Sequence, residues 1–344
     1  MGASSGYPPG PCGTERTVQP SGGGLLPKEG TGLRSYIGNR ALQYAIVLIA
    51  SSIIIFFMVR LNPTDPVAVI LGGKQTTPET IANIRADFHL DKSYVEQYRI
   101  WVFGIFRGDL GMSFKYRQAV SSLIRDRLPV TGGIVILSSL ILLLVSIPTG
   151  IITAVRQNSA LDTVISVIQL ILVACPPFLT SILMIWIITL AAPAFPFTGS
   201  FTNPGQYFQR IILPSVALAF SMIALTSRIV KSSMVEQIQS NYHMTAVSKG
   251  MDPWAVIMGH CFKNAIIPVI TVFGTQFGIL IVGSVLVESV FSLAGLGSIL
   301  MEGVKASDYP LVQGITILLV FVFMTISTVL DMVYGIIDPR IRLR

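Results

Sequence analysis

Residues 245–268 read TAVSKGMDPWAVIMGHCFKNAIIP and form a polar insertion in the hydrophobic second half of the chain. Gly250 lacks a β-carbon, so it can end a helix in the left-handed backbone conformation. Asp252-Pro253 is typical of the N-cap and first turn of a new helix. The stretch therefore predicts two short helices that meet at a corner. Ala246 and Gly250, four residues apart, give the first helix a small-residue face for another protein, although an ordinary loop is an equal alternative.

The composition on either side of this stretch is that of a membrane protein. Of 344 residues, 52% are hydrophobic and 12% are charged, against roughly 25% charged in soluble domains. The net charge of +7 does not indicate nucleic-acid binding, because the basic residues form no stripe beside aromatic side chains. We therefore expect the lipid bilayer to be a partner and nucleic acid not to be one.

The sequence predicts no catalytic, metal or cofactor site in this chain. Cys12, Cys175 and Cys261 are too far apart for a zinc pattern or a disulfide framework. Gly73-Lys74 lacks the other glycine and the Ser or Thr of a phosphate-binding loop, so no ATP site is expected. Ser, His and Asp residues are too scattered to indicate a hydrolase.

The N-terminal part predicts a tail, a first span and a helical insert. Residues 1–35 are rich in Gly, Pro and Ser and predict a disordered cytoplasmic tail. Ala41–Val59 has no charge and is long enough to cross a core of about 30 Å, with Arg34 and Arg40 on the cytoplasmic side. Residues 60–129 carry helix signals, including Thr77-Pro78-Glu79, and predict an extracytoplasmic insert.

Five further hydrophobic blocks predict a total of six membrane spans. They are Val130–Val155, Leu161–Ala191, Ile212–Lys231, Ile266–Val287 and Leu311–Ile336. The block 161–191 would be about 46 Å long as a straight helix, and Pro176-Pro177 lies in its middle. One bent span is the preferred interpretation, since each half alone is too short to cross. The kink indicates either a moving, water-filled region or a purely structural bend.

The short loops favour cytoplasmic termini and a cytoplasmic docking loop at residues 232–265. Basic residues on the expected inner side are Arg156, the group from Arg228 to Lys263, Arg340, Arg342 and Arg344. Only Arg210 and Lys305 fall in the short outer loops.

Polar residues within the spans are candidates for a pathway or gate. Glu288 and Asp331 fall near span ends, where contact with headgroups or water is favoured over a role in translocation. Gln169 and Gln276 lie deeper, so each either faces a pathway or bonds between helices.

The chain resembles the peptide-importer group of ABC importer permeases over residues 36–344. The cytoplasmic signature matches at Thr245-Ala246, Lys249-Gly250, His260, Lys263-Asn264-Ala265 and Pro268, although Met244 replaces the usual Glu. Further matching pieces are Gly108-Asp109-Leu110-Gly111 with Ser113, Leu128-Pro129, Pro176-Pro177-Phe178, Leu213-Pro214, Glu288 with Phe291, Gly295-Leu296-Gly297, Asp308-Tyr309 and Asp338-Pro339-Arg340. The large insert is similar to that of the first, B-type subunit of dipeptide and oligopeptide importers. The long tail and Cys261 depart from the family pattern.

The resemblance implies an all-α permease of the type I importer class with six transmembrane helices in a bacterial inner membrane. Implied partners are a second permease, two cytoplasmic ATPases that hold ATP and Mg, and an extracytoplasmic solute-binding protein. Residues 245–268 would dock an ATPase, through the matched residues Thr245, Ala246, Lys249, Gly250, His260, Lys263 and Asn264. A structural role for His260 is favoured over proton sensing.

Alternative functions remain open at this stage. The same architecture could import a nickel chelate, glutathione or an oligosaccharide instead of peptides. An ion-coupled carrier is less favoured, because we find no convincing internal repeat and no mid-membrane charge. A membrane receptor, with the insert as its ligand-binding part, is the third possibility.

Overall fold

The computed structural model describes residues 33–61, 65–72, 76–192 and 204–337 of the chain. These residues form thirteen α-helices and one π-helical turn, with no strand among them beyond a single bridge between Met112 and Ala119. The predicted tail lies outside the described residues except for its last three, which begin α1. The membrane protein predicted from composition and the all-α class implied by the resemblance are both confirmed.

In the part of the chain that the structure describes, five helices are long and apolar enough to cross a membrane. They are α1 (Leu33–Arg60), α5 (Val120–Val155), α8 (Pro204–Ile238), α11 (Phe262–Val290) and α13 (Tyr309–Ile337). A sixth span results if the bent pair α6 (Ala160–Ala174) and α7 (Pro177–Ala191) is counted as one. α5 begins ten residues earlier than the predicted second span, so residues 120–129 of the predicted insert continue that helix.

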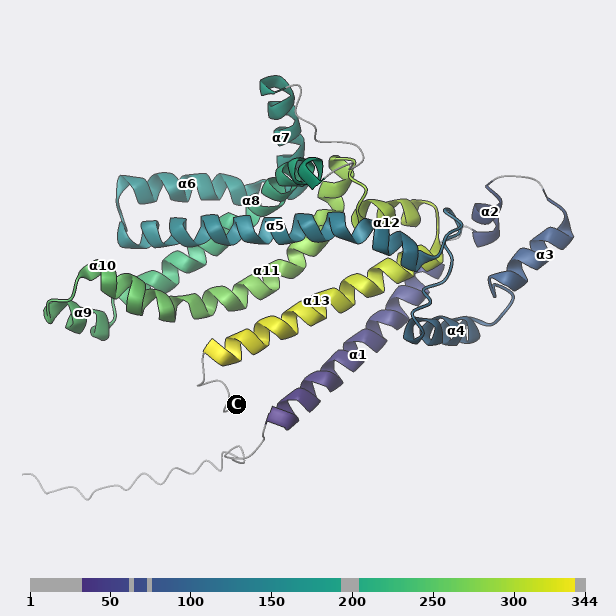
Figure 1. The fold of residues 1–344 in the computed structure, drawn as a ribbon, viewed down its shortest axis with the longest axis horizontal. Helices are drawn as coiled ribbons and strands as arrows, with labels where there is room; N and C mark the ends of the chain where they lie inside the picture. Colours follow the sequence, from purple (N-terminus) through teal and green to yellow (C-terminus); the bar gives the residue numbers. More distant parts are fainter. Residues whose placement is uncertain (1–32, 62–64, 73–75, 193–203, 338–344) are drawn as a thin grey trace, which may run out of the picture.

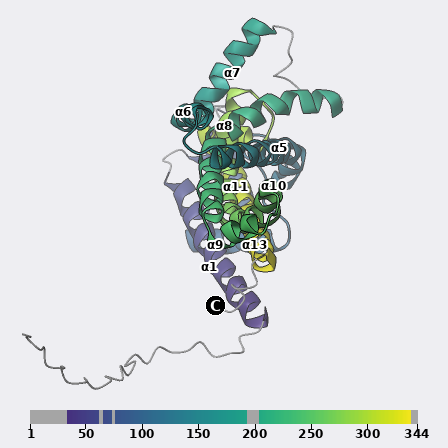
Figure 2. The same cartoon turned by 90° about the vertical axis from the view of Figure 1, so that its left-hand side faces the viewer.

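The bend predicted at Pro176-Pro177 is confirmed and is sharper than a kink. α6 and α7 meet at 105°, and Figure 2 shows α7 projecting away from the long helices. Cys175 is extended, with φ −95° and ψ 111°, because the residue before a proline avoids the helical region. Pro176 is extended as well, so two successive residues interrupt the helix. With fifteen residues each, α6 and α7 are about 22 Å long, and neither half would cross the membrane alone.

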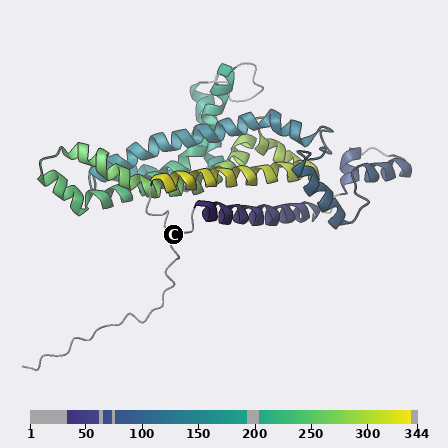
Figure 3. The same ribbon diagram turned by 60° about the horizontal axis from the view of Figure 1, so that its bottom comes forward.

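The middle of the bundle is built by α5, α8 and α11. Its buried side chains include Ile134, Leu142, Leu218, Leu280, Val287 and Phe291. Glycines permit the closest approaches, as expected for membrane helices. A β-carbon on Gly283 would lie 2.8 Å from a methyl of Leu218, and one on Gly150 would lie 2.5 Å from the β-carbon of Val230. α13 packs on α11, and α1 packs along α13, where Tyr44 and Thr328 share a hydrogen bond (Figure 3).

The described residues of the insert form three short helices, α2 (Pro66–Leu71), α3 (Pro78–Asp87) and α4 (Tyr94–Phe106). The predicted start of α3 is confirmed, because Thr77 caps it and Pro78 occupies its first turn. Phe56, Tyr98 and Trp101 pack together and hold α4 against the end of α1. Figure 1 shows α2, α3 and α4 at one end of the long helices, with α9 and α10 at the opposite end.

A connecting segment and α12 (Leu296–Lys305) close the bundle at the insert end. Ser113 Oγ donates a 2.5 Å hydrogen bond to Asp308 Oδ2, so two sequence pieces that resemble the family pattern meet in space. Lys115 Nζ lies 2.6 Å from Glu302 Oε2 on α12. This contact holds the pKa of Glu302 below its usual value and raises that of Lys115. The side chains of both residues are substantially exposed, so the pair adds little to stability.

Candidate functional site

The stretch 245–268 forms the predicted corner. α9 (Asn241–Ser248) is followed by Gly250, whose φ of 80° is left-handed, and the Met251 amide donates to the Ala246 carbonyl at 3.3 Å. α10 (Pro253–Val256) begins under an Asp252 cap, whose Oδ2 accepts from the Ala255 amide at 2.8 Å. The local signals in the sequence therefore place the corner correctly.

The second helix of the corner is not a separate short helix, which corrects the prediction. α10 runs through a π-helical turn, η1 (Ile257–Cys261), directly into α11. The chain therefore stays helical from Pro253 to Val290. The fifth span and the second arm of the corner are therefore one continuous helical rod, whereas α9 is a separate helix.

A buried cluster joins this rod to two other spans. We call it the corner core: Ile151 and Ala154 of α5, Val230 and Met234 of α8, and Val256, Ile257, Cys261, Ala265 and Val269 of the rod. Met234, Val256 and Cys261 are completely buried. Because close-packed side chains transmit displacement, a movement of the corner would move α5, α8 and α11 together.

The residues predicted to couple to an ATPase divide into two groups. Ala246 is only partly exposed and packs against the corner core, so part of its small face serves its own chain. The remaining predicted residues are exposed: Thr245, Lys249, Gly250, His260, Lys263 and Asn264. No atom beyond its immediate chain neighbours lies within 4 Å of a β-carbon built on Gly250, so its backbone is open to approach. Asn264 Nδ2 lies 3.4 Å from the Tyr242 hydroxyl, which links the two arms of the corner.

Sequence reasoning missed a set of exposed apolar side chains at the corner. The corner apolar set comprises Met244, Val247, Met251, Trp254 and Met258. Met244 and Trp254 are each 55% exposed. Exposed apolar side chains in one place mark a contact surface. The sequence does show these apolar residues inside an otherwise polar insertion. Whether they are exposed depends on which face of each helix packs against the corner core, and the sequence does not show this packing.

A polar network joins α5, α6 and α8 within the bundle. Gln169 Nε2 donates to Ser227 Oγ at 2.7 Å, and Ser227 Oγ also lies 2.9 Å from Thr149 Oγ1. Near the corner end, Lys231 Nζ lies 2.5 Å from Asp162 Oδ1. Of the two possibilities left open for Gln169, the structure has the bond between helices.

The predicted pathway residues Pro176 and Pro177 lie at the bend between α6 and α7, and their neighbours bind this bend to α8. Pro176 and Pro177 separate α6 from α7, and Ser221 Oγ donates to the Cys175 carbonyl at 2.9 Å. Thr180 Oγ1 reaches the Ala217 carbonyl at 3.2 Å. Two hydrogen bonds therefore fix the bend to α8.

Gln276 differs from Gln169. It is 1% exposed on α11, and neither its Oε1 nor its Nε2 has a hydrogen-bond partner among the described residues. An unpartnered buried amide lowers the stability of the fold. Such a group is typical of a site where the partner is supplied by another conformational state or by a ligand.

Glu288 does not reach headgroups or water, which corrects the favoured interpretation. Its side chain is fully buried, and its Oε2 accepts the amides of Gly297 at 2.7 Å and Ser298 at 3.2 Å. Thr131 Oγ1 accepts the Leu296 amide at 2.8 Å. These bonds satisfy the first turn of α12, so Glu288 joins the end of α11 to α12. The segment folds back tightly, because a β-carbon on Gly295 would lie 2.3 Å from Glu288 Oε2.

Comparisons with known proteins cover nearly all of the described chain. Residues 146–343 match the family of binding-protein-dependent transport system inner membrane components, and residues 33–135 match the N-terminal domain of such components. A putative peptide transport system permease protein of Brucella abortus is 36% identical over 313 residues, which are 90% of this chain and 99% of that protein. A dipeptide transport system permease protein of Alkalihalophilus pseudofirmus is 31% identical over 331 residues, which cover 90% of this chain and 99% of that protein. A probable peptide ABC transporter permease protein of Sinorhizobium fredii is 32% identical over 311 residues, which cover 89% of this chain and 99% of that protein.

Proposed function

The chain belongs to the family of binding-protein-dependent transport system inner membrane components, and on this premise we propose that it is the permease subunit of an ATP-driven peptide importer. The observation that carries the proposal is similarity across 90% of the chain to permeases named for peptide and dipeptide transport. Di- or oligopeptides are accordingly the proposed substrates. The subunit forms half of the translocation pathway.

We assign coupling to the corner. An importer permease without a nucleotide site of its own must receive movement from an ATPase through a protein contact. The corner apolar set offers exposed hydrophobic surface, Gly250 offers open backbone, and the corner core connects both to three spans. The same corner exposes polar residues that would form the rim of such an interface, namely Thr245, Lys249, His260, Lys263 and Asn264.

Within the membrane, Gln276 is the strongest pathway candidate. Its amide is buried and unpartnered, so a rearrangement of α11 would give it new hydrogen bonds. Gln169 with Pro176 and Pro177 instead suits gating, because the bonds that join Gln169 and Cys175 to α8 must break or shift when α6 and α7 move. Glu288 suits gating at the other end, through α12.

The proposed complex holds this chain, a second homologous permease, two cytoplasmic ATPases and an extracytoplasmic solute-binding protein. ATP and Mg²⁺ would bind in the ATPases, and this chain would be non-catalytic. Affinity purification of the tagged chain from its native membrane tests the assembly. We expect a second permease and two ATPases per chain, with ATP hydrolysis stimulated by the binding protein. Purification of the intact chain without any ATPase would contradict the proposal.

We place the corner and both termini in the cytoplasm of a bacterial cell, across the inner membrane from the insert. The corner and the insert lie at opposite ends of the bundle, so they fall on opposite sides of a membrane (Figure 1). Arg228, Lys231, Lys249 and Lys263 all lie at the corner end, where the positive-inside rule favours the cytoplasm.

A protease added outside spheroplasts is expected to cut within residues 60–129 and to spare residues 245–268. Trypsin suits this test, because Arg85 is half-exposed in the insert and Lys249 is exposed at the corner. Fragments are identified by mass spectrometry. Opening the membrane with detergent should add cleavage at Lys249, which serves as the control for accessibility. Cleavage at Lys249 in sealed spheroplasts would reverse the proposed orientation.

A further inference from the structure

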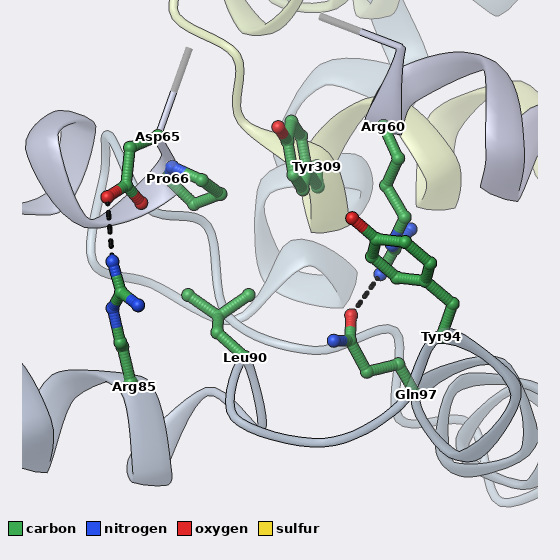
Figure 4. A pocket seen from close by; sticks show the side chains of 8 residues that line it. All are labelled: Arg60, Asp65, Pro66, Arg85, Leu90, Tyr94, Gln97 and Tyr309. Atoms are coloured by element: carbon green, nitrogen blue, oxygen red, sulfur yellow. Dashed lines mark hydrogen bonds and ion pairs between the residues drawn. The ribbon is translucent and has the colours of Figure 1, made fainter. Parts of the chain in front are cut away.

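A cavity of about 230 Å³ lies where the insert meets the ends of α1 and α13 (Figure 4). We call it the Arg60 pocket, and its lining residues are Arg60, Asp65, Pro66, Arg85, Leu90, Tyr94, Gln97 and Tyr309. Figure 4 shows Arg60, Tyr94, Gln97 and Tyr309 together on one side, Asp65 and Arg85 on the other, and Leu90 between them. No residue of the corner or of the polar network contributes to it.

Among the described residues, the groups that hold the guanidinium of Arg60 in place are neutral. Its Nη1 donates to the Phe56 carbonyl at 3.0 Å and its Nη2 to Gln97 Oε1 at 2.9 Å. The Phe56 ring lies 3.4 Å from the central carbon, and Gln97 is itself fixed by a 2.9 Å bond from its Nε2 to the Lys92 carbonyl. No carboxylate of the described residues pairs with Arg60. Arg60 is therefore a preorganised cation that uses two of the five N–H groups of a guanidinium on described residues.

The other two charges of the pocket neutralise each other. Arg85 Nη2 lies 3.0 Å from Asp65 Oδ2, and the other oxygen of Asp65 caps α2 by accepting from the Val67 amide at 3.0 Å. With this pair cancelled, the pocket carries the single positive charge of Arg60. A monoanion would balance this charge, whereas a dianion such as phosphate would face the Asp65 carboxylate with one charge left over.

We propose that the Arg60 pocket binds the terminal carboxylate of a short peptide. The fork of a guanidinium matches the two oxygens of a carboxylate. Tyr94 adds a hydroxyl at the pocket edge, and Leu90 adds an apolar surface for the last side chain. The volume falls below the roughly 300–1,000 Å³ of pockets that enclose a whole drug-sized ligand, so it suits one end of a peptide. The inference rests on the proposed function for its choice of peptides as the source of the carboxylate.

Direct binding to the full-length chain in lipid nanodiscs tests the proposal. The probes are N-acetyl-Ala-Ala and its C-terminal amide, which has the same shape without the charge, and affinity is read from ligand NMR titrations. The acid should bind at least about ten-fold more tightly than the amide, because a charged hydrogen bond contributes roughly 1.5–3 kcal/mol. Arg60→Gln should remove this preference, and Arg60→Lys should retain part of it.

Asp65→Asn supplies a test that changes affinity in the opposite direction. Asparagine can still cap α2, but the negative charge disappears and Arg85 becomes available, so the acid should bind several-fold more tightly. This variant keeps the proposal falsifiable if Arg60→Gln fails to fold. Equal affinity for acid and amide in the wild type, or no gain in Asp65→Asn, would overturn it.

The same titrations distinguish this proposal from the proposed function. If the assembled transporter imports peptides but the pocket does not discriminate acid from amide, the pocket proposal fails and the importer function stands. If the acid is preferred as expected but the complex imports no peptide, the carboxylate site stands and the peptide source fails.

Discussion

Trp254→Glu is expected to reduce ATP-driven uptake by at least roughly ten-fold while the protein remains folded in the membrane. Trp254 is 55% exposed beside the corner core, so its loss removes little of this chain's own packing. At a protein contact, however, a buried tryptophan commonly contributes 2 kcal/mol or more, and a carboxylate there would also be desolvated. Since 1.4 kcal/mol is ten-fold in affinity, binding of the ATPase should fall in parallel.

Uptake, recovery of the ATPase with the tagged chain and the thermal midpoint are measured on the same preparations. Trp254→Phe is the matched control, because it keeps an apolar ring at the same place and should retain most of the activity. Glu236→Gln, an exposed change on α8 outside the corner apolar set and the predicted coupling residues, should have a small effect. If Trp254→Glu binds the ATPase normally and transports at the wild-type rate, the corner apolar set is not the docking surface.

Gly150→Val is expected to prevent stable folding, at a cost of about 3 kcal/mol or more. A β-carbon at position 150 would lie 2.5 Å from the Val230 β-carbon and 2.8 Å from the Ser227 carbonyl. Both partners belong to α8, and the Ser227 oxygen is backbone, so relief requires α5 and α8 to separate. The polar network through Ser227 would be lost with this packing.

Gly132→Val is the matched control for this prediction, since it makes the same replacement within the same helix. No side chain or other segment lies within 4 Å of a β-carbon at position 132. The thermal midpoint in detergent and the amount of protein in the membrane should stay near wild type for Gly132→Val and fall strongly for Gly150→Val. Equal midpoints for the two variants would refute the close packing of α5 on α8.

The sequence predicted those features that depend on local chemistry. Runs of uncharged residues as long as 41–59 give spans because water is absent from the bilayer core. Gly250 and Asp252 encode the corner through backbone conformation and capping, which act over a few residues. Pro176-Pro177 predicted the break in the chain for the same reason.

The features it missed depend on contacts between distant segments. The position of Glu288 in the sequence places it near the end of a span. Its burial and its bond to Gly297 arise only because α12 folds back against the end of α11. The 105° turn of α7 exceeds what a proline imposes, and its direction is held by packing on α8, including the bond from Thr180 to Ala217.

The exposed surfaces of the chain illustrate the same limit. Ala246 appeared to face outward from its spacing with Gly250, yet it partly covers the corner core, whereas the larger Trp254 stays exposed. The Arg60 pocket likewise brings Arg60, Arg85 and Tyr309 together from three separate helices. No local sequence pattern indicates that these three residues lie close together.

The central claim, that this chain is the permease of an ATP-driven peptide importer, is tested most directly by uptake into proteoliposomes. Vesicles hold the purified complex with ATP inside, and labelled dipeptide with the solute-binding protein is added outside. The account predicts accumulation that requires internal ATP, the ATPases and the binding protein, and that persists when ion gradients are collapsed. Uptake driven by a proton or sodium gradient and indifferent to ATP would contradict it.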